Sequence, residues 1–367
     1  MATVLLGLFL SFAFVNVCFY LAFFSFASAK NRPKNNSGFP VSVIVCAKNE
    51  SENLTNFLPS ILEQDYPQFE IILINDASAD DTLEVMEKFR AIDGRIKIVD
   101  VENNEAFWAN KKYALTLGIK KAQYSHLVFT DADCAPESPQ WLQRITENFD
   151  ENTSIVLGYG GYFKHKNSLL NKLIRFETLL TAVQYFSYAR LGSPYMGVGR
   201  NLAYTSKQFY DQKGFANHLH LRSGDDDLFV NEAATSENTT ICFHPEAFTR
   251  SVPKRNLKQW FQQKRRHASI AKHYKPRHKT LLGLFYFSRL AFWLLLIVLL
   301  AFQIFWQVVT ASLAIVLLVE AVVYFKSARK LGETDVVWMF PILEVFLIFS
   351  QLAIFTANLF SKPKHWK

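Results

Sequence analysis

Residues 126–134 read His126-Leu127-Val128-Phe129-Thr130-Asp131-Ala132-Asp133-Cys134, an apolar run followed by two carboxylates. The run predicts a buried strand. Side chains at positions i and i+2 lie on the same side of an extended chain, so Asp131 and Asp133 are expected to point the same way. Hard divalent cations prefer carboxylate oxygens, and such a cation can hold a diphosphate. Asp-x-Asp is also common at turns and helix caps, so this interpretation needs support from elsewhere in the sequence.

The sequence around this stretch alternates between strands and helices. Strands are expected at 41–45, 70–74 and 95–101, with helical patterns after the first two and again at 111–121. Strands separated by helices of about 10–15 residues are typical of α/β domains with a mostly parallel sheet.

Polar residues directly follow three of these strands. They are the segment from Ala47 to Glu50, Asp76, and the pair Asp131 and Asp133. In a parallel sheet, ligands bind beyond the carboxyl ends of the strands, so the three clusters are expected to share one edge. The sequence therefore predicts a ligand site at that edge.

The second half of the soluble part is less regular. Helices are expected at 168–189 and after Asp227 through Ala234, and the glycine-rich segment 192–201 would let the backbone approach a ligand closely. Three adjacent carboxylates, Asp225-Asp226-Asp227, precede the second of these helices. Repulsion among them can raise the pKa of one carboxyl group, which would suit a general base.

Both ends of the chain are apolar. Residues 1–29 carry no charged side chain, residues 281–325 carry two, and a third apolar stretch runs from 336 to 360 with Pro341 and Glu344 as interruptions. Because about 20 apolar residues cross a bilayer core, we expect four crossings: an uncleaved N-terminal anchor, a helical pair and a last helix. Basic residues after the anchor predict that the soluble domain faces the cytosol.

Three charges inside the C-terminal apolar stretches need an explanation. Arg289 is expected to extend to the cytosolic interface, with binding of a lipid phosphate as the alternative. Glu320 lies near a predicted cytosolic end, where headgroups could solvate it. Glu344 is deeper, and the sequence assigns it no role.

The composition argues against two other kinds of site. The net charge is +8, but the basic residues cluster between Lys254 and Lys279, next to a membrane segment, which favours contact with anionic headgroups over nucleic acid. The four cysteines show no zinc-binding spacing and are interpreted as reduced thiols.

Five short motifs stand in a specific order. They are Val43-Ile-Val-Cys-Ala-Lys-Asn-Glu50, Asn75-Asp-Ala-Ser-Ala-Asp80, Thr130-Asp-Ala-Asp133, Gly224-Asp-Asp-Asp-Leu228 and Gln263-Lys-Arg-Arg-His267. In this order the chain resembles family-2 glycosyltransferases, in particular the membrane-integrated branch with cellulose and hyaluronan synthases, over residues 40–271. The resemblance implies a GT-A nucleotide-sugar-binding fold.

The resemblance also implies a donor site with a divalent cation, Mg²⁺ or Mn²⁺. Asp131 and Asp133 would hold the metal. The implied donor-binding residues are Ala47, Glu50, Asp76, Lys111, Asp131, Gln263, Arg266 and His267. Simpler roles remain open for several: a strand-end turn for Asp76, a solvated helix face for Lys111, and a lipid-facing basic helix for the last three.

The acceptor hydroxyl must lose a proton during transfer, so a carboxylate base is required. The resemblance implies Asp225 for this role, with Asp226 as the alternative because Gly224 stands where the family usually has Glu. Asp227 would support the site or cap a helix. His267 replaces the Trp of the family's last motif, which argues against extrusion of a long polymer.

The predicted organisation is an anchor at 1–29, a linker at 30–39, a cytosolic GT-A domain at 40–250, a basic interfacial segment at 251–280 and a membrane region at 281–367. The predicted function is inverting transfer from a nucleotide sugar, expected to be UDP-linked, to a lipid-linked or glycan acceptor at a bacterial-type inner membrane. The alternatives are a processive polysaccharide synthase with a translocation channel and a non-catalytic, nucleotide-sensing membrane subunit.

Overall fold

The computed structural model describes residues 1–31, 38–102, 111–221 and 223–361, so most of the expected linker and the basic tail lie outside the described residues. Two units divide the chain. A helical unit contains Met1–Lys30, Ser168–Leu191 and Asn256–Pro363, and a sheet unit contains Asn31–Asn167 and Gly192–Arg255. The predicted domain boundaries kept residues 168–191 with the soluble domain, whereas the structure groups them with the apolar helices.

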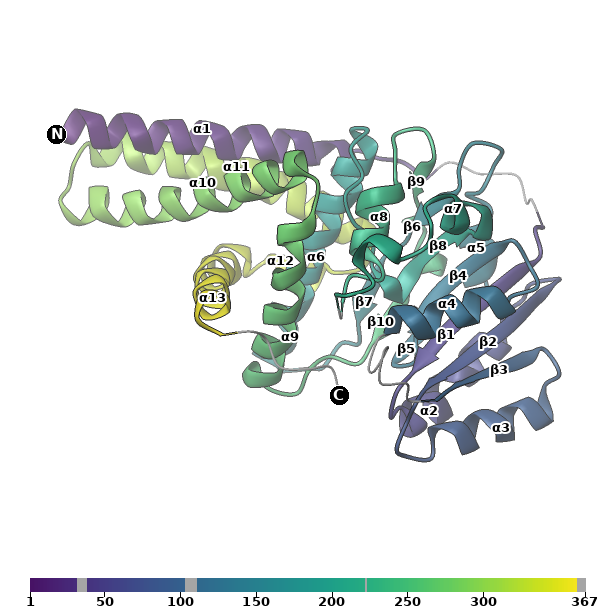
Figure 1. Ribbon diagram of the computed structural model, residues 1–367. Helices are drawn as coiled ribbons and strands as arrows, with labels where there is room; N and C mark the ends of the chain where they lie inside the picture. Colours follow the sequence, from purple (N-terminus) through teal and green to yellow (C-terminus); the bar gives the residue numbers. More distant parts are fainter. Residues whose placement is uncertain (32–37, 103–110, 222, 362–367) are drawn as a thin grey trace. The chain divides into compact units, whose positions relative to one another are not determined.

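The sheet unit follows the predicted alternation of strands and helices in its first half (Figure 1). Its elements are β1 (Val41–Ala47), α2 (Ser51–Leu62), β2 (Phe69–Asp76), α3 (Thr82–Ile92), β3 (Ile96–Val101), α4 (Lys111–Lys121), β4 (His126–Asp131), β5 (Cys134–Pro136), α5 (Trp141–Thr146), β6 (Ile155–Leu157), β7 (Gly160–Tyr162), β8 (Leu202–Thr205), α7 (Ser206–Asp211), α8 (Asp227–Ala233), β9 (Thr239–Ile241) and β10 (Thr249–Ser251).

Seven strands form the main sheet, in the order β3-β2-β1-β4-β8-β6-β9. The four strands predicted from sequence, β1 to β4, are parallel to one another. Strand β8 pairs antiparallel with β4 and with β6, and β9 is parallel to β6. The prediction of a mostly parallel α/β sheet is therefore confirmed, and a second sheet of order β5-β10-β7 adds three short strands that were not predicted.

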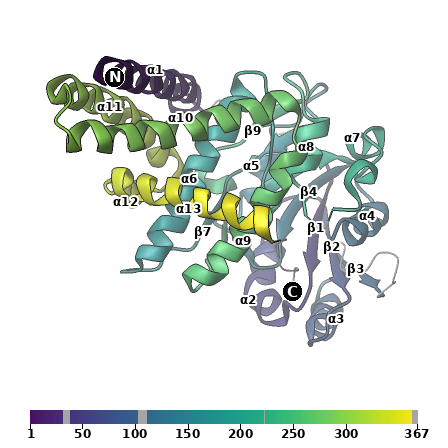
Figure 2. The same ribbon diagram turned by 60° about the vertical axis from the view of Figure 1, so that its left-hand side comes forward.

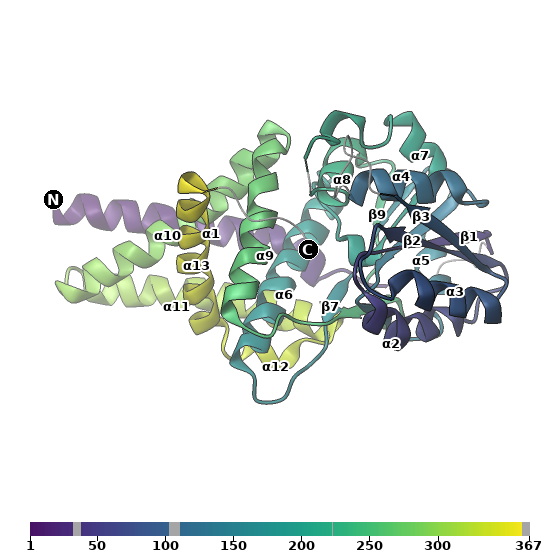
Figure 3. The same ribbon diagram turned by 60° about the horizontal axis from the view of Figure 1, so that its bottom comes forward.

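Alternate residues of the central strands face opposite helical layers. Val43 and Leu73 belong to a core that also contains Leu58 of α2 and Met86 of α3. On the other face α4 lies very close to the sheet, because a Cβ added at Gly118 would be 2.2 Å from Cδ1 of Ile74. Figure 3 shows α2 and α3 together on one face of the strands and α4 on the other. Burial on both faces explains the continuous apolar runs in these strands.

The helical unit contains four helices that are long and apolar enough to cross a membrane, among the residues described. They are α1 (Ala2–Ala27), α10 (Pro276–Ala301), α11 (Trp306–Leu331) and α13 (Phe340–Phe360). The other helices of the unit are α6 (Leu169–Arg190), α9 (Leu257–Ile270) and α12 (Thr334–Val337). Helices α1, α10 and α11 run side by side in Figures 1 and 2.

A turn and a short helix separate the C-terminal apolar helices. The turn between α10 and α11 includes Gln303 and Phe305, both with positive φ. Pro341 does not interrupt a helix; it stands in the first turn of α13, where proline has no hydrogen bond to lose. A short separate helix, α12, precedes it.

The charges inside the apolar helices pair with one another. Arg289 of α10 forms ion pairs with Glu320 of α11 and Glu344 of α13, and all three side chains are buried. The hydroxyl of Tyr20 on α1 donates a hydrogen bond of 3.0 Å to Glu344 and lies 2.6 Å from the Tyr324 hydroxyl. The predictions that Arg289 extends to the interface and that headgroups solvate Glu320 are therefore wrong. The sequence could not show which helices would bring these charges together.

Replacing Arg289 by Met is expected to destabilise the helical unit by about 3–5 kcal/mol, because two buried carboxylates would lose the cation that they share. Thermal unfolding of the purified protein in detergent measures this loss. Glu320→Gln is the matched control: one guanidinium then faces one carboxylate, so a much smaller shift of the midpoint is expected. Equal shifts for the two variants would contradict this account of the cluster.

Candidate active site

The predicted ligand edge is built by the ends of three neighbouring strands. Ala47, Asp76 and Asp131 are the last residues of β1, β2 and β4. The register places Cys46 of β1 opposite Asp131 on one side and Ile74 on the other. The structure therefore brings together the polar clusters that the sequence pattern placed at one edge.

The loops after β1 and β2 are joined by hydrogen bonds. The backbone N–H of Asn49, a residue with φ of 54°, donates to Oγ of Ser78 at 3.0 Å, and its side-chain oxygen accepts from the N–H of Ala79 at 2.7 Å. The N–H of Glu50 donates to Oγ1 of Thr82 at 2.8 Å. These bonds fix the loop that contains the predicted donor residues Ala47 and Glu50.

Asp76 is a buried carboxylate at the end of β2. Burial raises its pKa, and the ammonium groups of Lys48 and Lys111 act in the opposite direction. Nζ of Lys48 lies 3.8 Å from the Asp76 carboxylate and donates a 2.9 Å hydrogen bond to its backbone carbonyl. The side chain is thus held in the site and is not a solvated turn residue.

Asp131 and Asp133 lie close enough to hold one metal ion together. Ligand atoms of Asp131, Asp133 and Cys134 all lie within 4.8 Å of one another. A turn brings them together, and not the expected extended strand: Asp131 ends β4, whereas Asp133 belongs to the turn between β4 and β5. Burial, followed by repulsion from Asp131, raises the pKa of Asp133. A cation at this position would offset that cost.

Cys134 donates a hydrogen bond to the pair. Burial raises the pKa of its thiol well above the usual range, and a hard cation prefers oxygen ligands. Its Sγ donates to Oδ1 of Asp133 at 3.3 Å, and Oγ of Ser251 donates to the same oxygen at 3.1 Å. These two donors fix the Asp133 carboxylate.

Lys111 connects the donor side of the site with the acid triplet. Its Nζ lies 2.9 Å from Asp131 and 3.0 Å from Asp225. Burial by itself would lower the pKa of Lys111, but the two carboxylates raise it well above its usual value. A solvated helix face does not fit these contacts, because the side chain is only 17% exposed and lies between two carboxylates.

A cavity of about 20 Å³ lies beneath this bridge, with Cys46, Phe129 and Tyr204 among the residues that line it. That volume accommodates about one water molecule. A nucleotide sugar is far larger, so the cavity is the base of the site and not its donor pocket.

The three acids at 225–227 have different surroundings. Asp226 caps α8: its carboxylate accepts from the N–H of Gly199 at 2.7 Å and of Asp227 at 2.8 Å. Burial and the neighbouring Asp225 raise the pKa of Asp226 to about 6. For Asp225, burial acts to raise the pKa, but the ion pair with Lys111 lowers it overall. The raised pKa expected within the triplet therefore belongs to Asp226.

Gly224 has a φ of 89°, a conformation that residues with a Cβ rarely adopt. A Glu at this position would be strained. The glycine therefore permits the backbone conformation that leads into Asp225.

Lys112 is a positioning residue that the sequence analysis missed. Its buried Nζ donates to the carbonyls of His218, Leu221 and Ser223, at 2.8, 3.0 and 2.7 Å. These carbonyls belong to the loop that leads to Asp225. Consecutive residues of a helix point in different directions, which is the signal that could have separated the role of Lys112 from that of Lys111.

Replacing Lys112 by Met is expected to destabilise the sheet unit by about 1–3 kcal/mol, because buried carbonyls lose their donors. Activity should fall with it, since the loop positions Asp225. Burial lowers the pKa of Lys112 to about 8, so deprotonation above that pH leaves two N–H groups for three carbonyls. The wild type should therefore lose activity above about pH 8. Lys120→Met, at an exposed position of the same helix, is the control. Identical alkaline profiles for wild type and Lys112→Met would contradict this role.

Gln263, Arg266 and His267 lie on α9, in the helical unit, so their predicted approach to the nucleotide stays a prediction. Within that unit α9 is held from two sides. Trp260 and Lys264 contact Glu177 of α6 at 3.0 and 2.9 Å. Arg265 donates to Asn358 of α13 at 2.9 Å.

Comparisons with known proteins show which sequences the chain is similar to. Residues 42–214 match the family model described as glycosyl transferase family 2. Poly-beta-1,6-N-acetyl-D-glucosamine synthase of Staphylococcus epidermidis is 34% identical over 138 residues, which are 37% of this chain and 32% of the relative. An uncharacterized glycosyltransferase of Haemophilus influenzae is 34% identical over 124 residues, 34% of this chain and 36% of the relative. The chain thus matches about a third of the length of each relative.

A solved structure shares the fold along most of the chain. It is the mannosyltransferase PcManGT from Pyrobaculum calidifontis in complex with GDP-Man and Mn²⁺, with a TM-score of 0.61 and 17% identity over 93% of this chain and 98% of that one. The likeness confirms the GT-A-like α/β fold predicted from sequence.

Proposed function

We propose that the chain, whose residues 42–214 match the family model of glycosyl transferase family 2, transfers a sugar from a nucleotide-sugar donor to a lipid-linked or glycan acceptor, with inversion. The observation that carries this proposal is the Lys111 bridge between Asp131 and Asp225 at the carboxyl edge of the sheet. The amine of Lys111 connects Asp131, one of the two carboxylates proposed to hold the metal at the donor, with Asp225, the carboxylate proposed to act on the acceptor.

In the proposed reaction Asp225 accepts the proton of the acceptor hydroxyl. The hydroxyl oxygen attacks the anomeric carbon, and the bond from that carbon to the diphosphate oxygen breaks, which releases the nucleoside diphosphate. We assign the base to Asp225 because its carboxylate is paired with a side-chain amine, that of Lys111 at 3.0 Å. Asp226 is less suited, since two backbone N–H groups already occupy its carboxylate. Asp227 supports the start of α8.

Asp131 and Asp133 are the proposed ligands of a divalent cation, Mg²⁺ or Mn²⁺, which would stabilise the charge on the leaving diphosphate. Their oxygen donors and mutual distance fit such an ion. Lys111 is proposed to add a positive charge to the diphosphate. Asp76, Ala47 and Glu50 are proposed to contact the nucleoside. Gln263, Arg266 and His267 are proposed to cover the donor from α9.

The acceptor is proposed to be reached from the membrane. Four apolar helices support integration into a bilayer. Basic residues near the ends of α1 and α9 favour a cytosolic position of the sheet unit at a bacterial-type inner membrane. A UDP-linked donor is the first choice, and no role for nucleic acid is proposed.

A processive synthase remains a second candidate, because the Staphylococcus epidermidis relative is named as a polysaccharide synthase. The purified protein in detergent, a panel of radiolabelled nucleotide sugars, Mn²⁺ and a bacterial lipid extract test both candidates. Labelled product of one or a few sugars supports the proposal, and long polymer supports the synthase. Neither transfer nor donor hydrolysis with any member of the panel would instead favour a non-catalytic, nucleotide-sensing subunit.

A further inference from the structure

Arg200 is held rigidly by its backbone beside the two metal-binding candidates. Its carbonyl oxygen accepts hydrogen bonds from Oγ1 of Thr130 at 3.1 Å and of Thr249 at 2.9 Å. Thr130 directly precedes Asp131, the end of β4, and Thr249 begins β10. The position of the Arg200 main chain is therefore fixed relative to the Asp131–Asp133 turn.

The guanidinium of Arg200 is stacked but has few hydrogen-bond partners. It lies 4.3 Å from the ring centroid of Tyr162 and donates a hydrogen bond of 3.3 Å to the carbonyl of Gly161. No carboxylate within the described part of the chain forms an ion pair with it. Since a guanidinium has five N–H donors, most of its donor capacity is directed at no protein group.

The surroundings of Arg200 favour its charged form, and the neighbouring strand packs closely against its side chain. Burial acts against the charge, but Tyr162, Cys134, Asp131 and Asp133 raise the pKa of Arg200. A Cβ added at Gly160 would lie 3.0 Å from Cβ of Arg200 and 3.4 Å from its Nε, so the neighbouring strand can approach only because it has glycine there.

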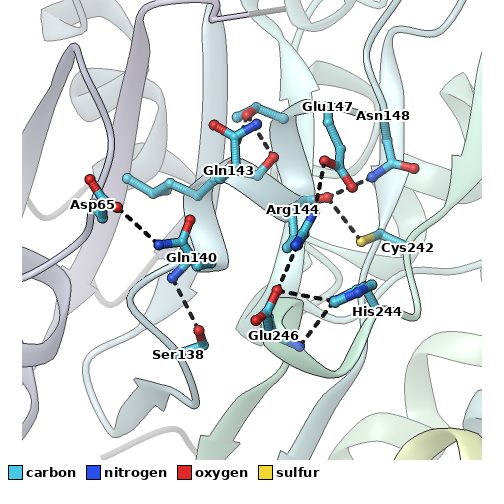
Figure 4. Close-up of polar contacts among 12 residues, drawn as sticks. Asp65, Ser138, Gln140, Gln143, Arg144, Glu147, Asn148, Cys242, His244 and Glu246 are labelled. Carbon is cyan, nitrogen blue, oxygen red and sulfur yellow. Dashed lines mark hydrogen bonds and ion pairs between the residues drawn. The ribbon is translucent and has the colours of Figure 1, made fainter. Parts of the chain in front are cut away.

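Two other arginines of the sheet unit, Arg250 and Arg144, form ion pairs with carboxylates and can be compared with Arg200. Arg250 contacts Glu137 through two nitrogens, at 2.8 and 3.1 Å. Arg144 contacts Glu246 at 2.7 Å and Glu147 at 3.4 Å, and all three appear in Figure 4. Both guanidinium groups are neutralised by carboxylates, and Arg200 is not.

We propose that Arg200 is a phosphate-binding residue of the active site, which donates hydrogen bonds from its planar guanidinium to phosphoryl oxygens beside the Asp131–Asp133 pair. The fork of N–H groups matches a phosphate, and stacking on Tyr162 reduces the entropy lost on binding. This inference rests on the proposed function. The phosphate has two possible sources, the diphosphate of the donor and the phosphate of a lipid-linked acceptor, which share this chemistry.

Inorganic pyrophosphate with Mn²⁺ probes the donor source without a base or a sugar. Titration calorimetry on the full-length protein in detergent should show that Arg200→Ala binds pyrophosphate about 10- to 100-fold more weakly than the wild type. Arg200→Lys, which keeps the charge and loses the fork, should lie between them. Arg144→Ala, which removes an arginine already paired with carboxylates, should bind as the wild type does (Figure 4). Melting profiles confirm that each variant is folded.

A polyprenyl monophosphate in mixed micelles probes the acceptor source with the same variants. Unchanged pyrophosphate binding with weaker binding of this lipid would assign the phosphate to the acceptor. If the folded Arg200→Ala protein binds both probes as tightly as the wild type, the inference is overturned. Failure of the wild type to bind either probe would contradict the proposed function itself, so the two failures are distinguishable.

Discussion

Asp225→Asn is expected to slow sugar transfer by about 10²- to 10⁴-fold, the usual contribution of a general base. The variant should still bind the donor within a few-fold of the wild type, because Lys111 keeps its contact with Asp131. Initial rates at saturating donor, together with donor binding, separate the two effects. Asp65→Asn is the control: it changes a carboxylate that contacts only the Gln140 side chain among the contacts drawn in Figure 4, and its rate should match the wild type. Full turnover by folded Asp225→Asn would show that the assigned base is wrong.

The pH dependence distinguishes Asp225 from its neighbour as the base. A base must be deprotonated, so the rate falls as the pH drops below its pKa. The Asp225 pKa is lowered by Lys111, whereas that of Asp226 is raised to about 6. If Asp225 is the base, the rate should stay level between about pH 7 and 5. A tenfold loss per pH unit below about 6 would assign the proton to Asp226 instead.

Asp133→Asn is expected to weaken Mn²⁺ binding by about 100-fold or more, since loss of even a residue that only supports a ligand costs 10–100-fold. Transfer at a fixed, low metal concentration should fall by a similar factor and recover in part when Mn²⁺ is added in excess. Metal titration of transfer rates measures both effects.

Cys134→Ala is the matched control for the metal site. Its thiol is one of two donors to the same Asp133 oxygen, and Ser251 remains in the variant, so Cys134→Ala should lose much less Mn²⁺ affinity than Asp133→Asn does. Equal loss of Mn²⁺ affinity in both variants would mean that the thiol is a ligand and that the site is not built from oxygens alone.

The first four strands and their helices could be predicted because burial on both faces of a parallel sheet leaves long apolar runs. The edge of the sheet at which a ligand is expected could be predicted from the same pattern, since Asp76 and Asp131 end the two parallel strands that flank β1. The four apolar helices were equally visible from length and composition. These features depend on residues that are close in the sequence, so the spacing of apolar and polar residues can predict them.

Other features depend on contacts between distant residues. The strands of the second sheet have three residues each, too few for an alternating pattern to be recognised. Lys112 contacts carbonyls more than 100 residues away, and Arg289 meets glutamates on two other helices. The sequence does not indicate the proposed role of Arg200, because that role depends on a contact that the guanidinium does not make: within the described residues it forms no ion pair with a carboxylate. No spacing within the sequence encodes such partners.

Binding of a nucleoside diphosphate in the presence and absence of Mn²⁺ tests the central claim most directly. Titration of the purified full-length protein with UDP and, separately, GDP should show binding that needs the metal, and Asp133→Asn should need a much higher Mn²⁺ concentration for the same binding while the protein keeps its melting profile. Binding that is the same with Mn²⁺ as with a chelator, in wild type and variant alike, would contradict a metal-dependent donor site at Asp131 and Asp133.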